Sequence, residues 1–265
     1  MSATPDLRHI AQTSQTAQTA RTALACLDLT SLNDADTPAD IEALCRRAQG
    51  PHGHTAAVCV WPRFVAQARS LLPKTIAVAA VANFPDGSSD IALAVRDTQA
   101  IVDAGGDEVD VVIPYRALGA APALLQAVRR ACAGQRLKVI LETGEIDGDA
   151  LILRACAMAL DAGADFLKTS TGKVRVNATP PSATLLLQAI AARPDTRSRV
   201  GFKPAGGVRT VADAAIYIAL TAQHLGDAAV SPARFRIGAS GLLSDIEAVL
   251  GGTAPAAPAV PAASY

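Results

Sequence analysis

The stretch DAGGDEVDVVI, residues 103–113, contains the pattern that decides the fold. Its glycine pair follows a segment of helical spacing, and an acidic residue then leads into a run of β-branched residues. The chain repeats this arrangement as DAGADFLK at residues 161–168, and Gly105 and Gly163 are 58 residues apart. Because that spacing fits two strand-and-helix units, both stretches predict the end of a helix and the start of a strand in a repeating α/β fold.

Short apolar runs alternate with segments of helical spacing along the rest of the chain. The apolar runs predict strands at residues 23–29, 56–61, 76–81, 108–113, 137–141, 165–168, 200–203 and 235–238. Segments rich in Ala and Leu predict helices at residues 39–48, 64–72, 91–102, 151–160 and 183–191. Eight such units within about 250 residues favour a (β/α)8 barrel. The alternative, an open doubly wound sheet, needs a glycine-rich fingerprint after its first strand, and none follows Leu29.

The two ends of the chain differ from this alternating middle. Residues 1–22 form an N-terminal extension rich in Ala, Thr and Gln, and residues 251–265 form a tail of Gly, Pro and Ala without periodicity. We therefore expect one catalytic barrel over residues 23–250 and a flexible C-terminal tail. The sequence assigns no role to the extension.

Composition narrows the class of protein. Half of the 265 residues are apolar, and Lys plus Arg balance Asp plus Glu at 24 each, so no overall charge attracts nucleic acid or an anionic membrane. Any affinity for phosphate must therefore be local. Five cysteines without paired short spacings indicate a reducing compartment. Because no apolar run is long enough to span a membrane, we expect a cytoplasmic protein.

Lys168 and Lys203 stand where two predicted strands end, each before small, turn-prone residues. Alternation along the strands turns both amines toward the barrel interior, together with Asp110 and Lys138. A desolvated amine beside a second cation loses its proton at neutral pH and attacks carbonyl compounds, which predicts Schiff-base chemistry. Two simpler interpretations stay open. Asp110 and Lys138 form only a buried ion pair, or Lys203 is a solvated loop residue, as we expect for Lys173.

Two glycine turns predict a phosphate site at the C-terminal ends of the last two strands. GGVR at residues 206–209 follows the seventh predicted strand, and GASG at residues 238–241 follows the eighth, just before a helix. Backbone N–H groups at such turns and at a helix N-terminus bind phosphate oxygens, and barrels often place this site after strands seven and eight. The alternative is two plain turns. The residues that we expect to bind the phosphate are Thr171, Gly206, Gly207, Arg209, Gly238 and Ser240.

Eight motifs span nearly the whole chain after its first twenty residues. They are LDLTSLN (27–33), AAVCVWPRF (56–64), NFPDG (83–87), DEVDVVIPYRAL (107–118), LKVILETGE (137–145), ADFLKTSTGK (164–173), GFKPAGGVRT (201–210) and the terminal ASY (263–265). Together they closely resemble the deoxyribose-phosphate aldolase family. The resemblance implies a (β/α)8 barrel and a class I aldolase that needs no metal or cofactor. It also implies reversible cleavage of 2-deoxy-D-ribose 5-phosphate to acetaldehyde and D-glyceraldehyde 3-phosphate by a homodimer.

The same resemblance implies roles for the interior residues. Lys168 matches the lysine that forms the Schiff base. Lys203 matches the neighbour that lowers the pKa of this lysine and takes part in proton transfer. Asp110 matches an acid-base carboxylate that works with a water, and Lys138 matches a lysine that orders this carboxylate.

Further residues take their roles from the resemblance alone. Asp28 matches a polar residue near the substrate hydroxyls, and Tyr265 matches a mobile tyrosine that assists proton transfer at the substrate C2. Gly241 stands where the family often has serine, which removes one hydroxyl donor for phosphate.

Cys59 is the thiol that we expect to be most exposed to reactive aldehydes, with a plain buried cysteine as the alternative. Two other functions stay open: a lysine-dependent aldolase or transaldolase for another phosphorylated sugar, and a non-catalytic sensor of sugar phosphate.

Overall fold

The computed structural model describes the backbone of residues 7–252 and the side chains of residues 14–252. Eight parallel strands lie in the order β7-β6-β5-β4-β3-β2-β1-β8, and isolated bridges between Phe202 and Phe235 and between Ala205 and Gly238 nearly close the ring. The strands are β1 (Leu27–Thr30), β2 (Ala57–Val60), β3 (Ala77–Ala82), β4 (Glu108–Val112), β5 (Arg136–Ile140), β6 (Phe166–Lys168), β7 (Gly201–Lys203) and β8 (Ile237–Ala239). The predicted barrel is confirmed.

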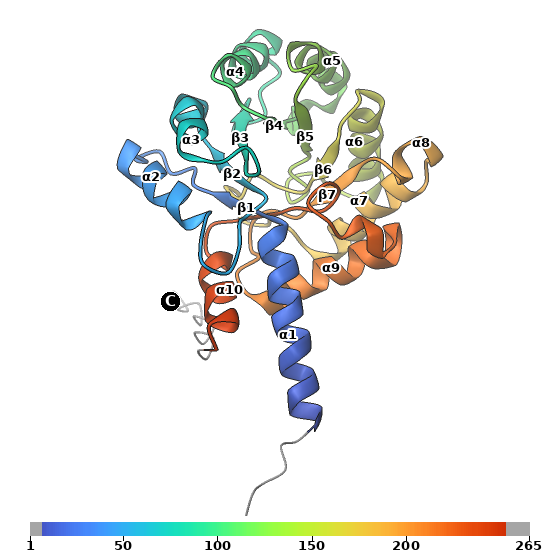
Figure 1. Cartoon of the computed structure of the whole chain (residues 1–265). Helices are drawn as coiled ribbons and strands as arrows, with labels where there is room; N and C mark the ends of the chain where they lie inside the picture. Colours follow the sequence, from blue (N-terminus) through green and yellow to red (C-terminus); the bar gives the residue numbers. More distant parts are fainter. Residues whose placement is uncertain (1–6, 253–265) are drawn as a thin grey trace, which may run out of the picture.

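Helices surround the strands (Figure 1). They are α1 (Leu7–Ala25), α2 (Pro38–Arg47), α3 (Val65–Leu71), α4 (Ile91–Asp103), α5 (Ala121–Ala131), α6 (Asp149–Asp161), α7 (Pro180–Ala191), α8 (Pro194–Arg197), α9 (Val211–Leu225) and α10 (Leu242–Leu250), with short 3-10 turns η1 (Pro62–Phe64), η2 (Tyr115–Ala120) and η3 (Asp227–Ala229). The five predicted helices are confirmed as α2, α3, α4, α6 and α7. Within residues 7–252, no helix combines the length and the apolar character that crossing a bilayer requires.

The repeated stretch performs the same task at both of its positions. Gly105 and Gly163 follow α4 and α6 with a φ of +83° each, the left-handed conformation that often ends a helix. Asp107 and Asp165 then each accept, at 2.8 Å, the backbone N–H of a residue on the preceding strand. Each repeat therefore ends a helix and attaches the incoming strand to its neighbour.

The start of the chain differs from the prediction. The first strand was expected at residues 23–29, but α1 continues to Ala25 and β1 begins only at Leu27. The boundary expected between residues 22 and 23 therefore falls inside α1. Figure 1 shows α1 beside α9 and α10, and the side chains of Ala20, Ala23 and Leu24 are buried. A short apolar run does not distinguish a strand from the end of a helix, and the packing partners of α1 lie about 200 residues away in sequence.

The strands separate two environments. Val109 and Val111 point outward into the large apolar cluster that the strands share with the helices, as strand alternation predicts. A much smaller apolar cluster of Leu32, Cys59, Ala79 and Val81 stands apart from it. The alternate positions of β4 to β7 instead turn charged side chains into the barrel, and these build the candidate site.

Candidate active site

Asp110 lies at the centre of a buried charge cluster. Its Oδ1 accepts a hydrogen bond from Lys138 Nζ at 2.6 Å, and its Oδ2 accepts from Lys168 Nζ at 2.9 Å and from Lys203 Nζ at 2.8 Å. Strand register explains the meeting, because Asp110 is aligned with Lys138 and Lys168 is aligned with Lys203 across neighbouring strands. All four side chains are buried. Their predicted inward direction is confirmed, and Lys203 is not a solvated loop residue.

The pKa values of the two lysines at the strand ends shift in opposite directions. Burial lowers the pKa of the Lys168 amine, and the Lys203 ammonium lowers it further, although Asp110 opposes both effects. Burial also works against the charged form of Lys203, but the carboxylates of Asp110 and Asp28 outweigh it and raise the pKa of Lys203. Of the two amines, Lys168 therefore gives up its proton more readily, beside the Lys203 ammonium.

Asp28 lies beneath Lys203 and is fully buried. Its Oδ2 accepts from Lys203 Nζ at 2.5 Å, and its Oδ1 accepts from Arg236 Nη1 at 2.6 Å. The expected place of Asp28 beside the substrate hydroxyls differs from this position, because both of its oxygens face cations inside the barrel. The carboxylate is thus placed to hold Lys203.

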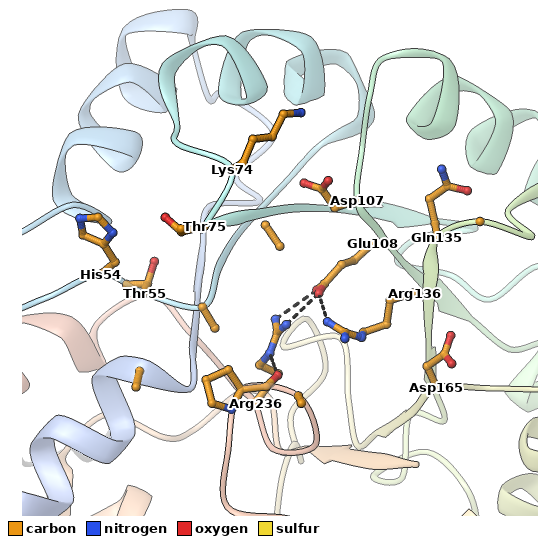
Figure 2. A pocket seen from close by; sticks show the side chains of 16 residues that line it. His54, Thr55, Lys74, Thr75, Asp107, Glu108, Gln135, Arg136, Asp165 and Arg236 are labelled. Atoms are coloured by element: carbon orange, nitrogen blue, oxygen red, sulfur yellow. Dashed lines mark hydrogen bonds and ion pairs between the residues drawn. The ribbon is translucent and has the colours of Figure 1, made fainter. Parts of the chain in front are cut away.

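Glu108 and Arg236 join the same cluster, and the sequence analysis missed both. Arg236 donates to Glu108 from both of its terminal nitrogens, at 3.1 and 2.7 Å, and Glu108 also contacts Lys138 Nζ at 2.6 Å. Figure 2 shows Glu108 between Arg236 and Arg136. A signal for Glu108 was present, because it stands two residues before Asp110 on one strand and so shares its face. Arg236 likewise stands two residues before Gly238, which the sequence had already assigned to the site.

A cavity of about 540 Å³ opens at the C-terminal ends of the strands, and Lys168 reaches it from the interior. Six of the seven residues expected to bind substrate line this cavity; Asp28 does not. The lining residues among those expected are Thr171, Gly206, Gly207, Arg209, Gly238 and Ser240. The predicted nucleophile and the predicted phosphate residues thus share one cavity.

The glycines of this cavity have different tasks. The amide of Gly206 donates to the carbonyl of Gly238 at 3.3 Å, and the amide of Gly238 donates to Pro204 at 2.9 Å. Both amides are therefore occupied, contrary to the expectation that these turns offer them to phosphate. Gly207 is exposed with a φ of +84°, and within residues 7–252 its amide has no hydrogen-bond partner. Among the described residues, no side chain caps the N-terminus of α10, which begins after Gly241, and such a helix start offers backbone amides to an anion.

Glu142 supports the opposite wall, and its role was missed as well. It follows β5 with a φ of +55° and is fully buried. It accepts from the Thr171 hydroxyl at 2.5 Å, and the Thr171 amide points to it at 3.3 Å. The Thr171 hydroxyl is thus already engaged. Lys173 is exposed, as expected, but its Nζ donates to the carbonyl of Leu32 at 2.7 Å at the edge of the cavity.

The structure tests the prediction for Cys59 but not the prediction for Tyr265. Cys59 is fully buried, and burial followed by the nearby Asp110 carboxylate raises the pKa of its thiol. All five cysteines are buried, so Cys59 is not the most accessible thiol, and the alternative of a buried cysteine describes it. Tyr265 lies outside the described residues, so its predicted role stays a prediction.

A second cavity, of about 850 Å³, lies at the opposite end of the barrel, where the strands begin (Figure 2). Arg236, Glu108 and Arg136 line it, so the charge cluster extends from one end of the barrel to the other. Lys168 faces the C-terminal cavity, and Arg136 and Arg236 face this one.

A parallel barrel with a lysine pair on one carboxylate, beneath a glycine-lined cavity, defines a class I aldolase. Comparison with known proteins agrees, since the model of the DeoC/LacD family of aldolases matches residues 22–244. This chain therefore belongs to the DeoC/LacD aldolase family, and the resemblance found in the sequence is confirmed.

Individual relatives give the same result. A deoxyribose-phosphate aldolase of Agrobacterium fabrum is 50% identical over 241 residues, which cover 88% of this chain and 92% of that protein. The tetrameric deoxyribose phosphate aldolase of Aeropyrum pernix has a TM-score of 0.72 at 25% identity, covering 92% of this chain and 98% of that chain. A protein of Toxoplasma gondii ME49 assigned to the same activity has a TM-score of 0.82 at 25% identity, with 92% and 98% covered.

Proposed function

We propose that this aldolase reversibly cleaves 2-deoxy-D-ribose 5-phosphate to acetaldehyde and D-glyceraldehyde 3-phosphate. The observation that carries the proposal is the Lys168 amine, which reaches the C-terminal cavity and lies 2.9 Å from Asp110. Because its pKa is lowered, this lysine supplies the neutral amine that attacks a carbonyl. The 50% identity to a deoxyribose-phosphate aldolase supports the choice of substrate.

The reaction follows from these groups. In the synthetic direction, the lone pair of Lys168 Nζ adds to the carbonyl carbon of acetaldehyde, and loss of water leaves an imine. Its protonated form is an electron sink, so a water held by Asp110 and Lys203 removes a proton from C2 and an enamine forms. The enamine carbon attacks the aldehyde carbon of glyceraldehyde 3-phosphate, whose oxygen takes up a proton. Hydrolysis of the new imine releases the sugar and restores the Lys168 amine.

Lys203, Asp110 and Lys138 prepare the nucleophile. Lys203 stays protonated and places a fixed positive charge beside Lys168, which favours the neutral amine. Asp110 accepts from Lys168 and Lys203 through the same oxygen, so the proton donor and the nucleophile converge on one point. The 2.6 Å contact with Lys138 holds the other oxygen and fixes the direction of the carboxylate.

Phosphate binding belongs to the outer part of the cavity. The Gly207 amide and the N-terminus of α10 supply backbone donors, while Ser240 and Arg209 supply a hydroxyl and a positive charge. Gly206 and Gly238 shape this part of the cavity, and Thr171 forms its wall. Because the phosphate lies away from the bond that changes, its binding energy serves to orient the acceptor aldehyde.

Borohydride trapping tests the nucleophile. With acetaldehyde present, reduction should fix a two-carbon adduct on Lys168, which peptide mass mapping would locate. Lys168→Met should lose the adduct, whereas the matched control Lys173→Met, at the exposed edge of the same cavity, should retain it. A stoichiometric adduct on Lys173 or Lys203 would contradict the assignment.

Substrate comparison tests the specificity. The enzyme should cleave deoxyribose 5-phosphate much faster than fructose or sedoheptulose phosphates. Preference for either of these would favour the aldolase or transaldolase for another sugar, and binding without turnover would favour the sensor. We further propose that the enzyme is a homodimer and needs no metal, so light scattering should give twice the chain mass and a chelator should leave activity intact.

A further inference from the structure

The interior of the barrel contains more cations than carboxylates. Among the described residues, the connected cluster contains three buried carboxylates and four buried cations, and none of these side chains is more than 4% exposed. They are Asp28, Glu108, Asp110, Lys138, Lys168, Lys203 and Arg236. If all were ionised, one positive charge would remain in a low-dielectric interior, which is unfavourable. Loss of one proton from one lysine restores neutrality.

Arg236 cannot supply that proton, because a guanidinium stays charged in proteins. It also occupies carboxylate oxygens that a lysine would otherwise use. Its nitrogens contact Asp28 Oδ1 at 2.6 Å and Glu108 Oε1 at 2.7 Å, and Nε donates to the carbonyl of Pro232 at 2.5 Å. The surplus positive charge must therefore leave from a lysine.

The contacts of the three lysines select which one loses its proton. Lys138 has carboxylate oxygens of Glu108 and Asp110 at 2.6 Å and of Asp28 at 3.5 Å. Among the residues whose side chains are described, Lys203 has two carboxylate partners, at 2.5 and 2.8 Å, whereas Lys168 has only Asp110 at 2.9 Å. Lys168 has the fewest partners, so its ammonium is the least stabilised.

Two other titratable groups face Lys168, and neither reverses this choice. Cys59 on β2 is a buried thiol whose pKa burial raises, so it stays neutral. Burial also raises the pKa of Glu142, and the hydrogen bonds of this carboxyl go to Thr171 rather than to a lysine.

We propose that Glu108 and Arg236 are positioning residues that decide the protonation state of Lys168 from the far end of the barrel. Arg236 favours the neutral amine by adding a permanent positive charge and occupying Asp28 and Glu108. Glu108 has the opposite effect, because it neutralises Lys138 and Arg236. Neither residue lines the C-terminal cavity, so neither touches substrate. The inference rests on the proposed role of Lys168 as the nucleophile.

The pH dependence of borohydride trapping with acetaldehyde tests the inference, because the acid limb of the profile reports the proton on Lys168. Arg236→Met should move the limb to higher pH by about one unit, the size expected when a unit charge about 12 Å away is removed at an effective dielectric of about 20. Glu108→Gln, which keeps the shape of the side chain, should move it to lower pH. The double variant Glu108→Gln with Arg236→Met should return the limb to near its original pH.

Arg136→Met is the matched control. Arg136 also contacts Glu108, at 2.7 Å, but its side chain is 36% exposed and solvent screens its charge, so the limb should shift much less. Shifts of the two single variants in the same direction, or no shift in either, would overturn the inference. If Arg236→Met fails to fold, the Glu108→Gln shift decides alone. An adduct away from Lys168 in the unmodified enzyme would instead refute the proposed function.

Discussion

Gly238 sits against the lysine that we propose to carry the proton, so a single methyl group there perturbs the site directly. A Cβ on residue 238 would lie 3.0 Å from Lys203 Cε and 2.9 Å from Ala205 Cβ. Carbon atoms in contact prefer about 3.5 to 4.0 Å, so something must move by about 0.5 to 1 Å. Ala205 is tied to Thr169 and bridged to residue 238, so the backbone must shift to relieve that contact, and the Lys203 side chain must also give way.

The expected cost follows from that displacement. Overpacking of a core position costs about 1 to 3 kcal/mol of unfolding free energy. Displacement of a catalytic group by about 1 Å slows catalysis up to about 100-fold. In Gly238→Ala we therefore expect kcat for deoxyribose 5-phosphate cleavage to fall about 10- to 100-fold with little change in KM, since the added methyl reaches Lys203 and leaves the phosphate donors in place.

A coupled assay for glyceraldehyde 3-phosphate, together with urea unfolding, measures both effects. Gly119→Ala is the matched control, because residue 119 is exposed, lines neither of the two cavities and has nothing within 4 Å of an added Cβ. Its kcat should stay within about twofold of the unmodified enzyme, as expected for an unstrained surface substitution. Full activity in Gly238→Ala would show that Lys203 does not need its observed position, and the reasoning would be refuted.

Three further predictions concern charge and the tail. Lys203→Met removes the cation beside Lys168, so the pKa of Lys168 should rise and the activity optimum move to higher pH; an unchanged profile with full activity would make Lys203 a bystander. Despite burial, Lys138 and Arg236 hold the pKa of Glu108 at about 2 against an ordinary 4.5, so its stabilising contribution should be complete above pH 4.5 and be lost as the pH falls toward 2. Acid titration of the unfolding free energy, with Glu108→Gln as a flatter comparison, checks this. Tyr265→Phe should slow C2 proton exchange in acetaldehyde without reducing the trapped imine on Lys168; wild-type exchange would remove the tyrosine from the mechanism.

Strand alternation was enough to predict much of this site. A residue next to an outward-facing one on a strand faces inward, so the directions of Asp110, Lys138, Lys168 and Lys203 followed once the strands were located. The repeated glycine and aspartate stretches predicted where helices end, because only a left-handed residue and a local carboxylate were needed. Such features depend on neighbours within a few residues, and they could be found from the chain alone.

Other features depended on residues far apart in sequence. The packing of α1 against α9 and α10 decided that residues 23–25 are helical. Closure of the barrel brought Arg236 to Asp28, 208 residues away, and so turned Asp28 from a candidate substrate contact into a support of Lys203. The occupied amides of Gly206 and Gly238 likewise follow from the isolated bridge between Ala205 and Gly238.

The chain alone thus determined which residues are ionisable and which face of a strand each occupies, because both are local properties. Only the folded barrel distinguishes the surroundings of the three buried lysines. Lys138, Lys168 and Lys203 have the same chemistry, and their difference lies in the number of carboxylate oxygens within reach, which strands β1 and β4 provide together. Coulomb interactions depend on distance in space rather than on separation along the chain, so this property exists only in the folded protein.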